Sequence, residues 1–168
     1  MNKNTKTIAL IGILTALYVV FALTLKIPMG IGNIALDLGY IVLTISAFKL
    51  GMRSAIVGGL GAMIESVLFS AYGISYGWIV MNIIIGLICG YILNRFKPNK
   101  HQYLFYGIVI IFAVFVGVSA KTIIECQLYS IPYLVKIPKS LVAWIIDSIV
   151  MIIGIFISKR VIKEAENE

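Results

Sequence analysis

Nine side chains in this sequence have the chemistry needed to hold a small organic molecule. They combine carboxyl groups, one carboxamide, two lysine ammonium groups and both tryptophan rings of the chain. A few hydrogen-bonding groups beside flat aromatic walls suit a heterocyclic ligand with polar substituents. The candidate binding residues are Asp37, Glu65, Trp78, Asn82, Lys121, Glu125, Lys139, Trp144 and Asp147.

These residues do not form a catalytic or metal-binding pattern. His101 is the only histidine and falls in a basic stretch, so neither a histidine metal cluster nor a Ser-His-Asp arrangement can form. Asp37 and Asp147 lack the glycine-rich context of an aspartyl protease. We therefore expect a binding protein that is not an enzyme and uses no metal or organic cofactor.

The composition indicates that most of the protein surface faces lipid rather than water. Hydrophobic residues make up 61% of the 168 positions and charged residues only 12%, whereas soluble domains are about 25% charged. The net charge of +7 could suggest nucleic acid, but the basic residues stand at the ends of apolar runs. That placement is typical of membrane proteins and argues against a nucleic-acid partner.

The chain is expected to be an all-α integral membrane protein, a single domain over residues 1–168 with six transmembrane helices in a compact bundle. Each crossing needs about 20 apolar residues, and only helices satisfy the backbone in lipid without closing a barrel. A loop from Ser130 to Pro138 should separate the last two spans, and the small residues Gly58, Gly59 and Gly61 should let the third span pack closely on a neighbour. The predicted spans cover residues 7–26, 34–50, 54–71, 77–96, 103–127 and 138–161.

Lysine and arginine positions orient this bundle with both termini in the cytoplasm. Cytoplasmic segments of membrane proteins are enriched in these residues. Four cations fall toward the outer side: Lys26, Lys121, Lys136 and Lys139. Ten fall on the inner side: Lys3, Lys6, Lys49, Arg53, Arg95, Lys97, Lys100, Lys159, Arg160 and Lys163.

In this orientation the polar residues gather in the outer half of the membrane. Glu65 and Asp147 fall near mid-depth, Asn82 lies about two turns below the outer face, and Lys121 and Glu125 fall in the outer third. A charged group inside a span costs at least about 2.5 kcal/mol, so each needs a partner, a cavity or a function. Their convergence predicts a pocket that opens outward.

Several of the candidate residues also have a structural explanation that requires no ligand. Lys121 and Glu125 stand four residues apart and can neutralise each other on one helix face. Glu65 and Asp147 can be neutral or internally paired carboxyls between helices, and Asp37 can be a first-turn acid favoured by the helix dipole.

The remaining candidates also have two explanations. Lys139 can reach the headgroups or meet an anionic ligand. Trp144 lies deeper than the usual interfacial aromatic belt and can either pack between helices or line the pocket.

Two local patterns, together with the length and the six spans, resemble the substrate-binding S components of energy-coupling factor (ECF) vitamin transporters over essentially the whole chain. Residues 8–17 are similar to the small-residue first helix of that family, with Gly12 and Ala16 four positions apart. Residues 50–61, followed by Glu65, resemble the glycine-rich start of its third helix and the acid after it.

The resemblance implies a bacterial cell-membrane protein that captures a vitamin-like micronutrient from outside. It also implies partners, namely an ECF transmembrane scaffold subunit and two cytoplasmic ATPases. Gly12 and Ala16 would dock on the scaffold, and Lys26 to Asn33 would form a lid over the pocket.

Two other functions remain open: a self-sufficient oligomeric transporter or channel, and a membrane assembly protein without a ligand. A channel requires polar residues at every depth, whereas the inner half here is almost entirely apolar. Riboflavin, pyridoxine-like compounds, pantothenate, folate and thiamine are all compatible with the candidate residues.

Substitutions at the candidate pocket test this hypothesis. Glu65→Gln and Trp144→Ala are expected to weaken uptake of the nutrient by cells while membrane expression stays at the parental level, because each removes a ligand-binding group. Normal uptake in both variants would remove the pocket assignment.

Overall fold

The structure, a computed structural model, describes residues 3–24, 27–28, 35–69, 74–96 and 101–166. These residues are almost entirely helical, and two very short strands pair antiparallel. Of the predicted lid, Lys26 and residues 29–33 lie outside the described residues. The elements are α1 (Lys3–Thr24), β1 (Ile27–Pro28), β2 (Ala35–Leu36), α2 (Gly39–Leu50), the 3-10 helix η1 (Gly51–Arg53), α3 (Ser54–Phe69), α4 (Tyr76–Arg95), α5 (Gln102–Leu128) and α6 (Tyr133–Glu166).

Three helices begin four or five residues away from the predicted start of their span. α1 begins at Lys3 rather than at residue 7. α2 begins at Gly39 rather than at residue 34, because residues 35–36 pair with β1. α6 begins at Tyr133, so the predicted loop extending to Pro138 is wrong. The carbonyl of Pro132 starts this helix by accepting the N–H groups of Val135 and Lys136 at 3.1 and 3.2 Å.

Pro138 therefore lies inside α6. A proline cannot donate to the carbonyl four residues earlier, which here belongs to Leu134. Leu134 is 88% exposed, so water or lipid headgroups can reach this end of the helix. Exposure near the helix end makes an internal proline tolerable.

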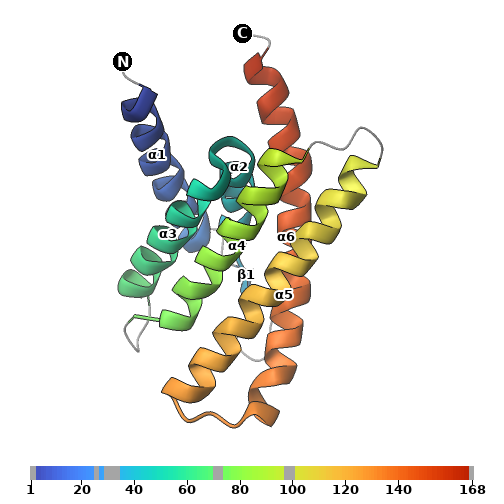
Figure 1. Cartoon of the computed structure of the whole chain (residues 1–168). Coiled ribbons are helices and arrows are strands. Elements are labelled where there is room, and N and C mark those ends of the chain that lie inside the picture. The colour runs from blue at the N-terminus through green and yellow to red at the C-terminus, as the bar shows by residue number, and fades with distance from the viewer. Residues whose placement is uncertain (1–2, 25–26, 29–34, 70–73, 97–100, 167–168) are drawn as a thin grey trace.

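Five segments of the described chain are long and apolar enough to cross a membrane, where the sequence predicted six spans. The difference lies in the segment Gly39–Leu68, which joins α2, η1 and α3. α2 has only 12 residues, or about 18 Å of helix, against a hydrocarbon core of about 30 Å. Gly51 adopts a φ of +61°, and the chain reverses direction there (Figure 1). α2 and α3 are therefore two separate helices rather than one continuous span.

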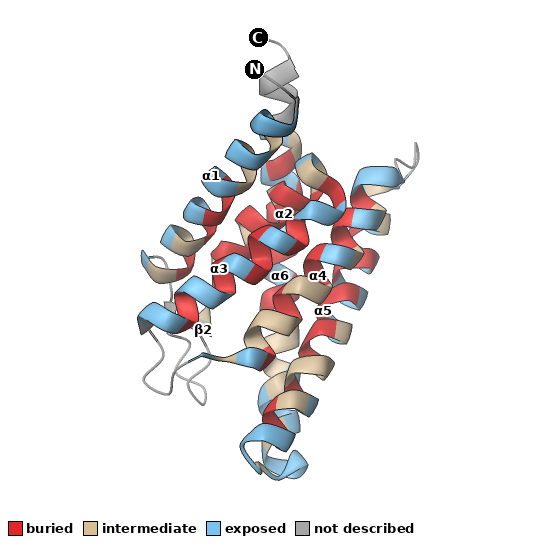
Figure 2. Ribbon diagram, turned by 60° about the vertical axis from the view of Figure 1, so that its left-hand side comes forward, coloured by how far each residue is buried: buried red, intermediate tan, exposed pale blue. Residues whose placement is uncertain are grey.

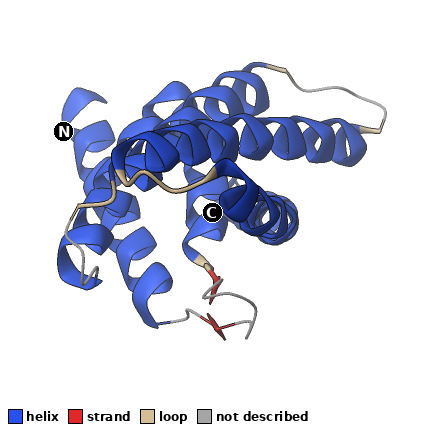
Figure 3. Ribbon diagram, turned by 90° about the horizontal axis from the view of Figure 1, so that it is seen from below, coloured by secondary structure: helices blue, strands red, loops and turns tan. Residues whose placement is uncertain are grey.

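Six helical legs bring both termini to the same end of the bundle (Figure 1). The helices form a closed ring in the order α1, α3, α4, α5, α6 and α2, and α2 also packs on α4. The β1–β2 pair lies at the margin of the helices when they are seen from below (Figure 3). The cytoplasmic location of the termini stays a prediction.

The pattern of buried and exposed residues matches this ring of helices. Buried residues face its interior, and exposed residues lie on the outer faces (Figure 2). The outer faces carry large apolar side chains such as Ile8, Phe112 and Phe156, which are 58–70% exposed. Water would disfavour such a surface, and hydrocarbon accommodates it.

Small residues bring α3 and α4 unusually close, as the glycine pattern of residues 58–61 predicted. A Cβ atom on Gly58 would lie 2.9 Å from the carbonyl oxygen of Asn82, and one on Gly86 would lie 2.6 Å from the Cα of Ala55. Ser54 Oγ donates to the Gly86 carbonyl at 2.8 Å. Near the end of this interface, a Cβ on Gly90 would overlap the backbone of Gly51.

Gly90→Ala should therefore destabilise the protein. The overlap is with backbone, which cannot rotate away, so we expect a loss of about 1–3 kcal/mol in the free energy of unfolding. Gly107→Ala is the matched control, because a Cβ there meets nothing within 4 Å and alanine favours a helix by about 0.5–1 kcal/mol. Thermal unfolding in detergent would measure both, and equal melting temperatures would contradict the close packing.

Candidate functional site

Buried and half-buried polar side chains from all six α-helices meet inside the ring, in the half of the bundle away from the termini. We call this group the central polar cluster. Its members interact through hydrogen bonds, ring contacts or electrostatic forces. They are Tyr18 of α1, Asp37 just before α2, Tyr40 of α2, Glu65 of α3, Trp78 and Asn82 of α4, Lys121 of α5 and Asp147 of α6.

A chain of hydrogen bonds links three helices at the centre of this cluster. Trp78 Nε1 donates to Glu65 Oε2 at 3.2 Å. The Asn82 amide nitrogen donates to the Trp78 carbonyl at 2.9 Å, and the Tyr18 hydroxyl donates to Asn82 Oδ1 at 3.1 Å. Glu65, Trp78 and Asn82 are therefore in contact with one another, and their predicted role in binding a substrate stays a prediction.

Lys121 places its ammonium group over an aromatic ring. Its Nζ atom lies 4.1 Å from the centroid of the Trp78 ring, a distance typical of a cation–π interaction. Lys121 also interacts electrostatically with Glu65, Glu125 and Asp147. The lysine therefore connects α5 with α3, α4 and α6.

Asp37 is deeply buried at the start of α2 rather than exposed at a membrane interface. The residue is 1% exposed, and its Oδ1 atom accepts the backbone N–H of Gly39 at 2.7 Å. This bond is a local turn contact ahead of the helix, because the N-cap of α2 is Leu38 and its first turn contains no acid, so the alternative of a first-turn acid is wrong. The same carboxyl also interacts electrostatically with Asp147 and with the hydroxyls of Tyr18 and Tyr40.

Two groups in the cluster retain unused hydrogen-bonding capacity among the described residues. Asp147 Oδ2 and the Tyr40 hydroxyl are buried without a hydrogen-bond partner there, and their residues are 4% and 0% exposed. Buried polar atoms are normally satisfied, so such exceptions need an explanation. These two groups are therefore candidate contacts for a ligand.

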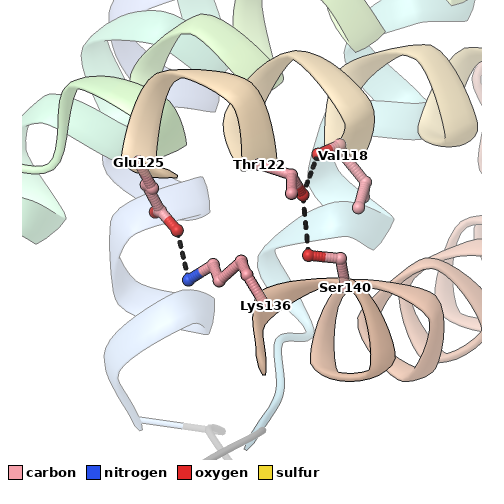
Figure 4. A network of polar contacts seen from close by, with 5 residues as sticks. All are labelled: Val118, Thr122, Glu125, Lys136 and Ser140. Atoms are coloured by element: carbon pink, nitrogen blue, oxygen red, sulfur yellow. Dashed lines mark hydrogen bonds and ion pairs between the residues drawn. The ribbon is translucent and has the colours of Figure 1, made fainter. Parts of the chain in front are cut away.

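Glu125 belongs to a second polar network, between α5 and α6. It forms an ion pair with Lys136, and one turn away Thr122 and Ser140 share a hydrogen bond of 2.6 Å between their hydroxyls (Figure 4). Glu125 interacts electrostatically with Lys121, as the sequence suggested, but its ion pair is with Lys136 of α6. The sequence missed this because Lys136 was assigned to a loop.

Trp144 and Lys139 do not join the central polar cluster. The Trp144 ring lies against α5, where Nε1 donates to the Ile111 carbonyl at 3.0 Å and the ring meets Phe115 edge-on at 5.6 Å. Trp144 lines two shallow apolar hollows of about 260 and 270 Å³ between α5 and α6. Lys139 is exposed. A ligand contact for either residue stays a prediction.

Tyr18 and Tyr40 are the cluster members that sequence reasoning missed. Both fall within the predicted spans 7–26 and 34–50, and each carries a hydroxyl into a membrane-spanning segment. A tyrosine far from the ends of a span is a usable signal, since its hydroxyl must find a partner there. In the described part of the chain, no group of His, Cys, Asp or Glu could hold a metal ion, and Cys89 and Cys126 are free and buried.

The fold and the cluster define a multi-pass helical membrane protein that encloses a polar centre. Comparison with protein families agrees, since the family described as "ECF-type riboflavin transporter, S component" matches residues 2–163. The chain therefore belongs to this family of transporter S components. The resemblance noted in the sequence is confirmed.

A curated relative gives a shorter match. A "UPF0397 protein" of Enterococcus faecalis (strain ATCC 700802 / V583) is 35% identical over 93 residues, which are 54% of this chain and 49% of the relative. The aligned region thus spans about half the length of that relative. No solved structure matches the chain significantly.

Lys136→Met tests the α5–α6 network. The change leaves the carboxylate of Glu125, a 7% exposed residue, without its ion-pair partner, and we expect a loss of about 2–4 kcal/mol in the free energy of unfolding. The double variant Lys136→Met/Glu125→Gln should recover much of that loss, because it also removes the charge. Thermal unfolding of both proteins in detergent measures this coupling, and additive losses would contradict it.

Proposed function

We propose that this protein is the substrate-capturing subunit of an ECF-type importer in a bacterial plasma membrane. It binds a vitamin or similar small organic nutrient at the outer face and delivers it to a membrane scaffold subunit powered by two cytoplasmic ATPases. The observation that carries the proposal is the central polar cluster, with its unused hydrogen-bonding groups, in a chain of the S component family.

The distribution of charge supports this orientation. Lys6, Lys49, Arg53 and Arg95 belong to helix ends on the side of the termini, which is the cytoplasmic side under the positive-inside rule. The cluster then lies toward the outside. A nutrient arriving from the medium reaches it first, before any contact with the ATPases.

The substrate is expected to contact the cluster through groups of three kinds. Asp147 and Tyr40 offer free hydrogen-bonding atoms, and Trp78 offers a ring face that Lys121 now covers. Asp37, Glu65 and Asn82 hold the surrounding hydrogen bonds. In this proposal Glu125 and Trp144 fix α5 against α6, and Lys139 meets the ligand on its way in.

The first helix provides a surface for the scaffold subunit. Gly12 and Ala16 are exposed on α1, and a Cβ on Gly12 would meet nothing within 4 Å. Small residues four apart let another helix approach closely in a membrane. The exposed side of α1 is therefore where we place the docking contact.

A binding screen tests the capture step. The purified chain is incubated with riboflavin, thiamine, pyridoxine, pantothenate and folate in turn, and its melting temperature is measured. One compound should raise it by several degrees, because binding only to the folded state stabilises that state. If no compound from the panel or from cell extract raises it, the capture function fails and a ligand-free assembly role gains support.

Gly12→Leu/Ala16→Leu tests the docking step separately. Two bulky side chains should prevent close approach of the scaffold, reducing both co-purification of the scaffold and nutrient uptake at least tenfold, while ligand-induced stabilisation persists. Gly107→Leu is the control, as another glycine whose Cβ would meet nothing within 4 Å, here in α5. Normal assembly in the double variant would contradict docking through α1.

A further inference from the structure

One side chain of α1 reaches from that helix into the central polar cluster. Tyr18 is completely buried, and its hydroxyl donates to Asn82 Oδ1 on α4 at 3.1 Å. The helix itself packs on α2 and α3, so this hydrogen bond extends past its immediate neighbours. Tyr18 therefore joins α1 directly to the part of the cluster that α4 contributes.

Glycines on two other helices make room for the Tyr18 ring. A Cβ atom on Gly61 of α3 would overlap the ring, and one on Gly39 of α2 would lie 3.2 Å from the ring atom Cε2. The ring thus lies against backbone on two sides. Backbone in a packed interior cannot rotate away as a flexible side chain can, so the position of the ring is tied to the position of α1 relative to α2 and α3.

The two faces of α1 have different surroundings. Leu14, Thr15 and Tyr18 are buried against the bundle, whereas Gly12 and Ala16 are exposed. The exposed pair is where we place the contact with the scaffold subunit. Because one helix carries both faces, a displacement of its exposed face also displaces Tyr18.

A small displacement of α1 is enough to change the cluster. The Tyr18–Asn82 bond is 3.1 Å long, just beyond the usual O–H···O range of about 2.5–3.0 Å, so lengthening it by about 1 Å would break it. Asn82 Oδ1 would then lose this donor. The Asn82 amide nitrogen donates to the Trp78 carbonyl, and the Trp78 indole donates to Glu65. The change would therefore reach the surroundings of Trp78.

We infer that Tyr18 is a positioning residue that couples the docking face of α1 to the central polar cluster. This inference rests on the proposed function and adds that contact with the scaffold subunit changes the surroundings of Trp78. A coupling between two binding sites is reciprocal. A ligand in the cluster would therefore change the affinity of α1 for the scaffold by the same factor.

Trp78 supplies a reporter for this coupling, and Trp144 supplies an internal control. They are the two tryptophans of the chain, and Trp144 lies against α5 outside the cluster. The full chain is labelled with 5-fluorotryptophan, purified in detergent, mixed with the unlabelled complex of scaffold subunit and ATPases, and observed by fluorine NMR. Trp144→Phe assigns the two resonances. We expect the Trp78 resonance to shift by more than its line width and the Trp144 resonance to stay in place.

Tyr18→Phe removes the hydroxyl and keeps the ring between the two glycines. It should abolish the Trp78 shift, while binding of the scaffold complex, measured by co-purification, stays near the parental level. Tyr91→Phe is the matched control, because Tyr91 is exposed on α4, and the Trp78 shift should persist there. A merely structural Tyr18 would leave the scaffold-dependent shift intact, so a normal Trp78 shift in folded Tyr18→Phe would overturn the inference.

Asn82→Ala guards against misfolding of the Tyr18 variant, because it breaks the same hydrogen bond from the other side. It should also abolish the scaffold-dependent Trp78 shift, and a normal shift in this variant would contradict a path through Tyr18. If the parent chain binds the scaffold complex without a Trp78 shift, or with equal shifts of both resonances, the inference fails and the docking proposal stands. If the parent chain does not bind the scaffold complex at all, the docking proposal fails as well.

Discussion

In hydrocarbon, a polar side chain must find its partners inside the protein, and the arrangement of this chain depends on that constraint. The central polar cluster draws one or two residues from every α-helix. No single helix can satisfy such groups, because their partners lie on neighbours that are distant in sequence. Tyr18 and Asn82, for example, are 64 positions apart and share one hydrogen bond. The closed ring of helices is what makes burial of these groups possible.

Close packing of small residues allows the ring to form. Gly58, Gly86 and Gly90 let the backbones of α3 and α4 approach to distances at which a Cβ atom would clash. Without a hydrophobic driving force between helices in lipid, such contacts and interhelical hydrogen bonds supply much of the association energy. The same approach carries Glu65 of α3 to the Trp78 indole of α4. The α3–α4 interface thus determines both how these two helices pack and where Glu65 and Trp78 lie.

The protein has two separate groups of polar residues, one inside the ring and one between α5 and α6. Inside the ring, acidic groups, hydroxyls and Trp78 form a centre with unused hydrogen-bonding capacity. Between α5 and α6, the Glu125–Lys136 ion pair and the Thr122–Ser140 hydrogen bond use their polar groups on each other (Figure 4). Trp144 belongs to the latter side, bonded to the backbone of α5. This division explains why polar residues at similar depth have different roles.

The sequence alone determined that the protein surface faces lipid, that the membrane segments are helical, and which family the chain resembles. Apolar runs of spanning length admit few alternatives to helices in lipid, and Glu65, Trp78, Asn82, Lys121 and Asp147 stood out because polar groups are rare there. The tertiary structure decided what periodicity cannot encode. It showed that Glu125 forms an ion pair with Lys136, that Trp144 lies outside the cluster, and that Tyr18 and Tyr40 lie inside it. Partners across helices depend on helix rotation and on where each helix begins, and these are fixed only when all six pack together.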